Sequence, residues 1–414
     1  SDGENGWYIA PFTVSVTGTD ATSGIALVQV RSNGGAWQDN SLLLGTEGVN
    51  NLDFRSQDNA GNTATTSQQL YLDLTDPVLN LSRAGTPGLA GWYISPVTVN
   101  ANASDVISGI SEIEMRQNGG VWQAVNSLNL SADGVYAIEA RAGDNAGRET
   151  TVADTIPVDV TYPSLEATFP VPDGENGWYI APFTVNVTGA DATSGLALVQ
   201  ARYAGGLWQD NALLVDREGL VDVEFRSQDN AGNTTNTPEQ FSVDLSNPTL
   251  SMSNTGTAGL SGWYISPVTV TAIGNDAVSG LQSVQMRSNG GAWAATNSLL
   301  LAADGIYTVD ALAEDNAGRQ NQAQESVNVD ATAPTLTATY PVPDGLNNWY
   351  VNPVEISISG TDATSGILLA QVRSNGGSWS NSLTLSDEGI NSLDFRVQDN
   401  AGNLSTANSQ VSLD

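Results

Sequence analysis

The chain of 414 residues carries 45 acidic residues against 13 basic ones, and it contains no Cys and no His. The resulting formal net charge of −32 disfavours binding to nucleic acid or to anionic membranes. All the basic residues are arginines, so the composition also excludes catalytic His, Cys or Lys, an ordinary zinc site, disulfides and lysine-based cross-links.

The first 77 residues contain short runs in which apolar and polar residues alternate with a period of two, as in half-buried β-strands. In chain order the apolar positions are Phe12, Val14 and Val16, then Val28 and Val30, then Leu52 and Phe54, and finally Leu70, Leu72 and Leu74. Turn-forming sequences separate the runs, and Asn33-Gly34-Gly35 is typical of a β-hairpin. No period of 3.6 residues appears, so the pattern predicts about seven strands in a two-sheet sandwich.

The tryptophans indicate that this pattern occurs five times. They form two series with a period of about 85 residues: Trp7, Trp92, Trp178, Trp263 and Trp349, and then Trp37, Trp122, Trp208, Trp293 and Trp379. We therefore predict five modules, with boundaries near Pro77, Pro163, Pro248 and Pro334. They span residues 1–77 (whose first strand is missing), 78–163, 164–248, 249–334 and 335–414. One modest core per module predicts a linear array and an elongated rod.

A second period is superimposed on the first. Modules one, three and five begin with Asp-Gly-x-Asn-x-Trp, at Asp2, Asp173 and Asp344, whereas modules two and four begin with Gly-Leu-x-Gly-Trp, at Gly88 and Gly259. Two interpretations remain open. The alternation could record the duplication of a pair that had already diverged, or odd and even modules could face different neighbours.

Several motifs of the second module carry a resemblance to a known family. They are the run from Gly91-Trp92-Tyr93 to Val99, then Asp105-x-x-Ser108-Gly109, Asn118-Gly119-Gly120-Val121-Trp122 and Asp144-Asn145-Ala146-Gly147. The chain resembles the bacterial Ig-like repeats that occur in tandem in large secreted and surface-anchored proteins, such as adhesins and the accessory regions of extracellular hydrolases. The resemblance implies an all-β, Ig-like β-sandwich fold, and it leaves the function open because such repeats are spacers in many unrelated proteins.

Two acidic loops recur in every module. The first, Asp-x-x-Ser-Gly, contains Asp20, Asp105, Asp191, Asp276 and Asp362, and the second, Asp-Asn-Ala-Gly, contains Asp58, Asp144, Asp229, Asp315 and Asp399. On an Ig-like sandwich the first loop should follow the second strand, and the second loop should join the last two strands. Both loops then lie at the end where the chain enters the module.

A third carboxylate lies four residues before each junction proline. These residues are Asp73, Asp159, Asp244 and Asp330, and Asp414 occupies the same position in the last module. Three hard oxygen donors would converge at each junction, which are the ligands that calcium prefers. One hypothesis is therefore that calcium binds at the junctions, as in cadherin-like arrays, held for example by Asp73, Asp105 and Asp144.

Turn chemistry alone is the competing interpretation of these acids. Asp-Asn-Ala-Gly fits a type I turn with Asp first and Gly fourth, and Asp-x-x-Ser-Gly fits a turn capped by its own side chain. Asp73 and its equivalents would then be outward-facing strand residues.

The aromatic residues also allow two interpretations. Exposed Trp and Tyr faces can stack on sugars, but both Trp series stand next to strands at fixed spacing, which favours packing. We expect Tyr8, Tyr93, Tyr179, Tyr264 and Tyr350 to be the more exposed partners. Arginines recur on two strands that should be neighbours, with Asp53 or Glu139 close by, and ordinary cross-strand charge pairing explains them.

The function favoured by these patterns is a non-catalytic structural or adhesive segment of a long extracellular surface protein, in a stalk or filament. Its partners would be like modules of the same or a neighbouring chain, with no nucleic acid and no membrane insertion, since no apolar run approaches the ~20 residues that cross a bilayer. The alternative is a carbohydrate-binding or accessory array of a secreted glycan-active protein. Ser1 begins within a repeat, so we expect the array to continue in a longer chain.

Overall fold

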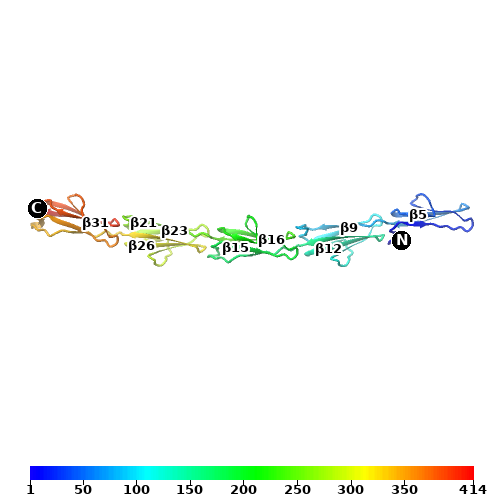
Figure 1. Ribbon diagram of the computed structural model, residues 1–414, viewed down its shortest axis with the longest axis horizontal. Helices are drawn as coiled ribbons and strands as arrows, with labels where there is room; N and C mark the ends of the chain where they lie inside the picture. The colour runs from blue at the N-terminus through cyan, green and yellow to red at the C-terminus, as the bar shows by residue number, and fades with distance from the viewer. The chain divides into compact units, whose positions relative to one another are not determined.

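The computed structural model describes residues 1–414, and its regular structure consists almost entirely of β-strands (Figure 1). The helical segment η1 (Leu346–Asn348) is a single turn. None of the helical structure has the length and hydrophobicity that spanning a bilayer requires. The prediction of an all-β chain is therefore confirmed. The chain divides into two compact units, one of residues 1–168, 186–213 and 224–238, the other of residues 169–185, 214–223 and 239–414.

The five sequence repeats contain six or seven strands each. The first repeat has β1 (Trp7–Tyr8), β2 (Phe12–Ser15), β3 (Ile25–Ser32), β4 (Gln38–Asp39), β5 (Ser41–Leu44), β6 (Gly48–Asp58) and β7 (Thr63–Leu72). The second has β8 (Val78–Ala84), β9 (Val97–Ser104), β10 (Ile110–Gln117), β11 (Ser127–Leu130), β12 (Gly134–Asp144) and β13 (Glu149–Val158). The third has β14 (Glu166–Thr168), β15 (Phe183–Thr188), β16 (Leu196–Tyr203), β17 (Gln209–Asp210), β18 (Ala212–Val215), β19 (Gly219–Asp229) and β20 (Thr234–Val243).

The last two repeats follow the same order. The fourth has β21 (Thr249–Thr255), β22 (Trp263–Tyr264), β23 (Val268–Asn275), β24 (Leu281–Ser288), β25 (Ser298–Leu301), β26 (Gly305–Asp315) and β27 (Gln320–Val329). The fifth has β28 (Thr337–Thr339), β29 (Trp349–Tyr350), β30 (Val354–Ser359), β31 (Ile367–Ser374), β32 (Ser382–Leu385), β33 (Gly389–Asp399) and β34 (Leu404–Leu413).

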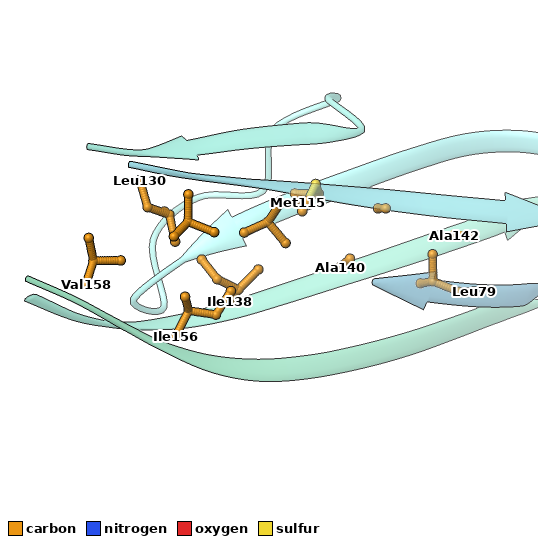
Figure 2. Close-up of a cluster of buried hydrophobic side chains, with 11 residues drawn as sticks. Leu79, Met115, Leu130, Ile138, Ala140, Ala142, Ile156 and Val158 are labelled. Carbon is orange, nitrogen blue, oxygen red and sulfur yellow. The ribbon is translucent and has the colours of Figure 1, made fainter. Parts of the chain in front are cut away.

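The second repeat shows how a sandwich forms from the alternating pattern. One sheet has the order β11-β9-β8 and the other β10-β12-β13, with every pair antiparallel. Strand β12 turns Ile138, Ala140 and Ala142 inward, and all three are buried, whereas Glu139 and Arg141 face outward. Figure 2 shows these side chains packed with Met115 of β10 between the two sheets. Full burial of a large side chain such as Ile138 or Met115 stabilises the fold by about 1.5–3 kcal/mol.

The Trp-Tyr pair near the start of a repeat lies in the second sheet. In the fourth repeat β21 pairs with β23 in one sheet, and β22 then pairs in parallel with the last strand, β27, in the other. The same parallel pairing joins β1 to β7 and β29 to β34. The chain therefore changes sheet before its Trp-Tyr pair, and this brings the start and the end of each repeat together.

The first repeat lacks a partner strand on one side. Strand β2 pairs only with β5, so this sheet has two strands where the second repeat has three. The other sheet, β1-β7-β6-β3-β4, is complete and contains the predicted hairpin around Asn33, whose φ is +52°. In the third repeat, β14 pairs with β15 and β16 with β17.

Candidate metal centres where repeats meet

Three carboxylates converge wherever one sequence repeat meets the next, a place we call a joint. One oxygen of each carboxylate lies within 4.8 Å of the others in four sets: Asp73, Asp105 and Asp144; Asp159, Asp191 and Asp229; Asp244, Asp276 and Asp315; and Asp330, Asp362 and Asp399. The first two sets belong to one compact unit and the last two to the other. The sequence had predicted these groupings. Joints are named below by the two repeats that they connect, from joint 1/2 to joint 4/5.

The topology explains why residues far apart in sequence meet. Asp73 directly follows β7, the last strand of the first repeat. Asp105 lies in the turn between β9 and β10, and Asp144 ends β12, so both belong to loops at one end of the second repeat. The predicted positions of the two acidic loops are therefore correct.

Backbone N–H groups hold one oxygen of each loop carboxylate. Asp105 Oδ1 accepts hydrogen bonds from the N–H groups of Ile107, Ser108 and Gly109 at 3.0, 2.8 and 2.9 Å. Asp144 Oδ1 accepts from Ala146 and Arg148, both at 2.9 Å. The turn-capping interpretation is thus right about these bonds. It does not compete with metal binding, because a carboxylate has a second oxygen.

The carboxylate that follows the last strand is buried, which the turn interpretation did not expect. Asp73, Asp159, Asp244 and Asp330 are all 0% exposed. They are not outward-facing strand residues, because the N–H group of Asp73 continues the parallel pairing by donating to the Tyr8 carbonyl at 2.9 Å. The Oδ2 atoms of Asp73, Asp144 and Asp315 are buried without a hydrogen-bond donor. An ionised oxygen in this position is costly unless a donor or a cation compensates it.

The electrostatics agree with this burial. Burial raises the pKa of Asp315 above its ordinary value, and the charges of Asp244 and Asp276 raise it further. Burial likewise raises the pKa of Asp330, with contributions from Asp362 and Asp399. Carboxylates that accept several backbone N–H groups behave differently. At joint 4/5 burial disfavours the ionised form of Asp362, but hydrogen bonds from the N–H groups of Gly366, Thr364 and Ser365 outweigh it and lower the pKa of this carboxylate. The first repeat contains a similar loop. There, hydrogen bonds from the N–H groups of Ser23, Thr22 and Gly24 lower the pKa of Asp20.

The residue that follows each Asp-Asn-Ala-Gly loop also contributes to the joint, and its role was not predicted. It is Asn233 and Asn403 at joints 2/3 and 4/5, where the side-chain amide donates to Oδ2 of Asp229 and Asp399, both at 2.9 Å. At joints 1/2 and 3/4 it is Arg148 and Arg319. The signal was present, because Asn and Arg alternate at this position in step with the motifs that begin the modules.

The prediction that the five tyrosines are more exposed than the tryptophans was wrong for Tyr179 and Tyr350, which are buried beside half-buried Trp178 and Trp349. Tyr179 and Tyr350 are only 4% and 5% exposed, and Tyr8, Tyr93 and Tyr264 are half-buried against their core clusters. The parallel pairing of the Trp-Tyr segment turns the Tyr ring inward, where Tyr179 stacks on Phe183 with centroids 3.9 Å apart. All ten tryptophans are half-buried, as packing predicts.

The second tryptophan series covers the recurring arginines. Trp122 lies against both Arg116 and Arg141, with guanidinium carbons 4.4 and 4.6 Å from the ring centroid. Equivalent pairs of arginines contact Trp37, Trp208 and Trp379. The predicted ion pairs are also present, for example Arg31 with Asp53 at 2.9 Å. Sequence reasoning found the charge pairs but not their aromatic cover.

Comparisons with known proteins give only structural likenesses. No family model and no curated protein matches the chain. A tetra-tandem repeat from the extending region of a large adhesion protein is 16% identical, with a TM-score of 0.29, over 81% of this chain and 99% of that one. The human desmocollin-1 ectodomain is 11% identical, with a TM-score of 0.27, over 99% and 96%. The protocadherin gammaB4 extracellular domain is 14% identical, with a TM-score of 0.31, over 98% and 81%.

Proposed function

We propose that the chain is a non-catalytic structural or adhesive segment of an extracellular surface protein, and that calcium binds at its joints and stiffens them. The observation that carries this proposal is the buried carboxylate set at each joint, with Asp73, Asp144 and Asp315 each leaving an oxygen without a donor. An adhesive stalk needs successive repeats to keep a fixed relative orientation, and these acids lie where two repeats meet.

The donor chemistry favours calcium over other cations. Calcium takes six to eight oxygen ligands at flexible geometry, whereas magnesium demands a near-ideal octahedron and gives up water reluctantly. Asp73, Asp105 and Asp144 would supply three charged oxygens to the ion, drawn from two repeats. The ion would therefore connect the end of one repeat to two loops of the next.

Repulsion between the carboxylates of one joint would be relieved by a bound cation. Two unit charges about 4.8 Å apart repel by about 3–4 kcal/mol at an effective dielectric constant of about 20. A joint that holds three ionised carboxylates without a cation is therefore strained. Calcium removes this strain, so it should stabilise the chain by binding to the folded joint only.

The remaining features fit an extracellular setting. Calcium-binding modules outside cells bind the ion at about 10⁻⁴–10⁻³ M, which suits joints that are loaded only outside the cell. The proposed partners are like modules of the same or neighbouring chains. A carbohydrate-binding array is less well supported, because the Trp rings cover arginines and the Tyr rings lie in the cores.

Calorimetric titration of the metal-free chain with calcium tests the proposal. We expect up to four sites with dissociation constants of about 10⁻⁴–10⁻³ M and a thermal midpoint that rises with calcium concentration. Magnesium at equal ionic strength is the control, and it should raise the midpoint less. A midpoint that excess calcium leaves unchanged, with no heat of binding, would refute the calcium part of the proposal.

A further inference from the structure

Each joint also contains a contact that involves no carboxylate. The turn that precedes the first-series Trp of one repeat, which we call the leading turn, meets the Asp-Asn-Ala-Gly loop of the next repeat. In all four joints a leading-turn N–H donates to the loop alanine's carbonyl, from Glu4 to Ala146, Leu89 to Ala231, Glu175 to Ala317 and Leu260 to Ala401, at 2.7–2.9 Å. The four loop alanines are completely buried, whereas Ala60 in the first repeat is exposed.

Glycines allow this close approach from both sides. A Cβ atom on Gly88 would lie 2.2 Å from the Ala231 carbonyl oxygen, and one on Gly3 would lie 2.5 Å from that of Ala146. Across the joint, Gly232 has a φ of +103°, and a Cβ atom there would lie 3.0 Å from Leu89 Cγ. Any larger side chain would push the two repeats apart.

The side chains around this common contact differ between alternate joints. Joints 1/2 and 3/4, the polar joints, have Glu and Asn in the leading turn. Asn5 and Asn176 donate to the carbonyls of Asn145 and Asn316 at 3.0 and 2.9 Å.

An arginine of the next repeat completes each polar joint. Arg148 Nε donates to Asp76 Oδ1 at 2.7 Å, and its Nη1 donates to the Ile9 carbonyl at 3.1 Å. Arg319 repeats both bonds at joint 3/4, to Asn247 Oδ1 and the Ile180 carbonyl, at 2.9 and 2.6 Å. Asp2 and Asp173 fold the leading segment for this contact by accepting from the N–H groups of Ile9 and Ile180.

Joints 2/3 and 4/5, the apolar joints, have different residues in the leading turn, before the junction proline and after the Asp-Asn-Ala-Gly loop. Leu89 and Leu260 lie over Gly232 and Gly402, and Ala90 and Ser261 stand where the polar joints have Asn. The side-chain amides of Asn233 and Asn403 donate to the carbonyls of Asp159 and Asp330, at 3.0 and 2.8 Å. Tyr162 and Ala333 take the places of Asp76 and Asn247 before the junction proline.

We propose that three positions determine which repeats can pair. They are the leading turn, the residue before the junction proline and the residue that follows the Asp-Asn-Ala-Gly loop of the next repeat. A leading turn with Glu-Asn, together with Asp or Asn before the proline, pairs with a following repeat in which Arg follows the Asp-Asn-Ala-Gly loop. A leading turn with Leu, together with Tyr or Ala before the proline, pairs with a following repeat in which Asn follows this loop. The kind of partner that each repeat end fits is therefore a repeat of the other class, and the odd-even alternation keeps the repeats in order.

Mismatched joints would lose specific bonds. The shorter side chain of the Arg148→Asn variant cannot reach both Asp76 and the Ile9 carbonyl, so two hydrogen bonds across the joint are lost. Asn233→Arg should weaken its joint more, because Asn233 is only 5% exposed and its amide donates to both the Asp159 carbonyl and Asp229 Oδ2. The guanidinium would be buried with no carboxamide or carboxylate at position 162 to receive it.

Hydrogen exchange of the full chain, followed by mass spectrometry of joint peptides, tests this rule. We expect Arg148→Asn to speed exchange in the Glu4 leading turn by about three- to tenfold, and Asn233→Arg to speed that around Leu89 by about tenfold or more. Converting the leading turn of joint 1/2 as well, with Glu4→Leu and Asn5→Ala, should slow hydrogen exchange in the Arg148→Asn chain again, to within about twofold of joint 2/3.

The chain supplies its own controls. In the Arg148→Asn chain, joint 3/4 has the same design and no change, and strand β12 reports whether the repeat remains folded. The contacts contain no metal ion, so the experiment is run both with excess calcium and with chelator, and its result remains interpretable if the calcium proposal fails. The rule is overturned if both single variants exchange at the wild-type rate, or if the three-residue conversion is no slower than Arg148→Asn alone.

Discussion

Asp73 and Asp144 come from successive repeats, yet both are buried at one joint and the Oδ2 atom of each lacks a hydrogen-bond donor. Asp229 and Asp399, which occupy the position of Asp144 at joints 2/3 and 4/5, have this oxygen bound by Asn233 and Asn403. If calcium binds as we propose, joints 1/2 and 3/4 should therefore depend on it more than the other two joints do.

We expect Asp144→Asn to separate the metal role of this residue from its turn role. The Asn carbonyl oxygen can still accept from Ala146 and Arg148, so the calcium-free chain should keep its stability or gain slightly from the loss of repulsion. The stabilisation that calcium gives this joint, about 1–3 kcal/mol at 10–100 times the dissociation constant, should disappear. Scanning calorimetry with and without calcium measures both effects.

Asp58→Asn is the matched control for this prediction. Asp58 caps the same turn in the first repeat, accepting from the N–H groups of Ala60 and Asn62, but it belongs to none of the four sets. Its variant should leave the calcium-dependent stabilisation unchanged. If both variants lowered stability alike and neither altered the calcium response, Asp144 would have only a turn role.

The joint acids also predict how calcium binding depends on pH. A folded-state pKa raised above the unfolded value means that Asp315 and Asp330 favour folding when protonated. That contribution is fully present below the ordinary value of 3.8 and is lost as pH rises through the raised values. The calcium-free chain should therefore lose these contributions towards neutral pH, where calcium binds the ionised carboxylates and restores stability.

Thermal midpoints measured against pH, with calcium and with chelator, test this sign. The difference between the two curves should shrink as the pH falls through the raised pKa values. Asp315→Asn should reduce the difference at neutral pH and flatten its pH dependence. A calcium effect that is the same at acidic and neutral pH would contradict this account.

The sequence was sufficient to predict the strand pattern and the meeting of the three carboxylates. Alternation with period two places Val28 and Val30 inside, and a sandwich topology brings the loops of Asp105 and Asp144 to one end. Both follow from local pattern and connectivity, which repeat at every module. The predicted module boundaries remain a prediction.

The parts that the sequence did not reveal depend on three-dimensional packing. The side chains of Tyr179 and Tyr350 point into the core because their segment pairs in parallel with the last strand, and no local pattern shows a change of sheet. The role of Asn233 depends on a carbonyl of the preceding repeat, Asp159, which is distant in sequence. Such contacts become visible only when the two repeats are placed together.

The glycines of the leading turn predict a defect confined to a joint. Gly259→Ala would place a Cβ atom 2.2 Å from the Ala401 carbonyl oxygen, so the joint must open. We expect faster hydrogen exchange at the Leu260 N–H and a cost of about 1–3 kcal/mol. Gly345→Ala is the control, because its Cβ atom would meet only its own repeat, 2.8 Å from the Trp349 carbonyl oxygen and 3.1 Å from Val351.

These two variants distinguish strain in the turn from strain across the joint. Both should lower the stability of the turn, but only Gly259→Ala should increase exchange in the loop around Ala401. Equal exchange in that loop in the two variants would show that the close approach does not hold the repeats together.

The fifth repeat allows the aromatic cover to be tested against its charges. Trp379 lies over Arg373 and Arg396, at 4.5 and 4.4 Å, whereas the fourth repeat has Leu312, only 8% exposed, in place of the second arginine. We expect Arg396→Leu to change stability by less than about 1 kcal/mol, because the leucine replaces a cation–π contact with apolar packing under the ring. Trp379→Ala should cost about 1.5–3 kcal/mol, because it uncovers both guanidinium stems.

Trp293→Ala in the fourth repeat completes the comparison, since Trp293 contacts only Arg287 among the arginines, at 4.4 Å. It should cost about 0.5–1 kcal/mol less than Trp379→Ala if the second arginine contributes as a cation–π contact does. Chemical denaturation of the three variants gives these differences. If Arg396→Leu lowered the free energy of unfolding as much as Trp379→Ala, the ring would stabilise the fold through its contact with the arginine and not by packing on the sheet. Strong binding to a glycan array that is abolished by Trp379→Ala would instead restore the carbohydrate-binding function.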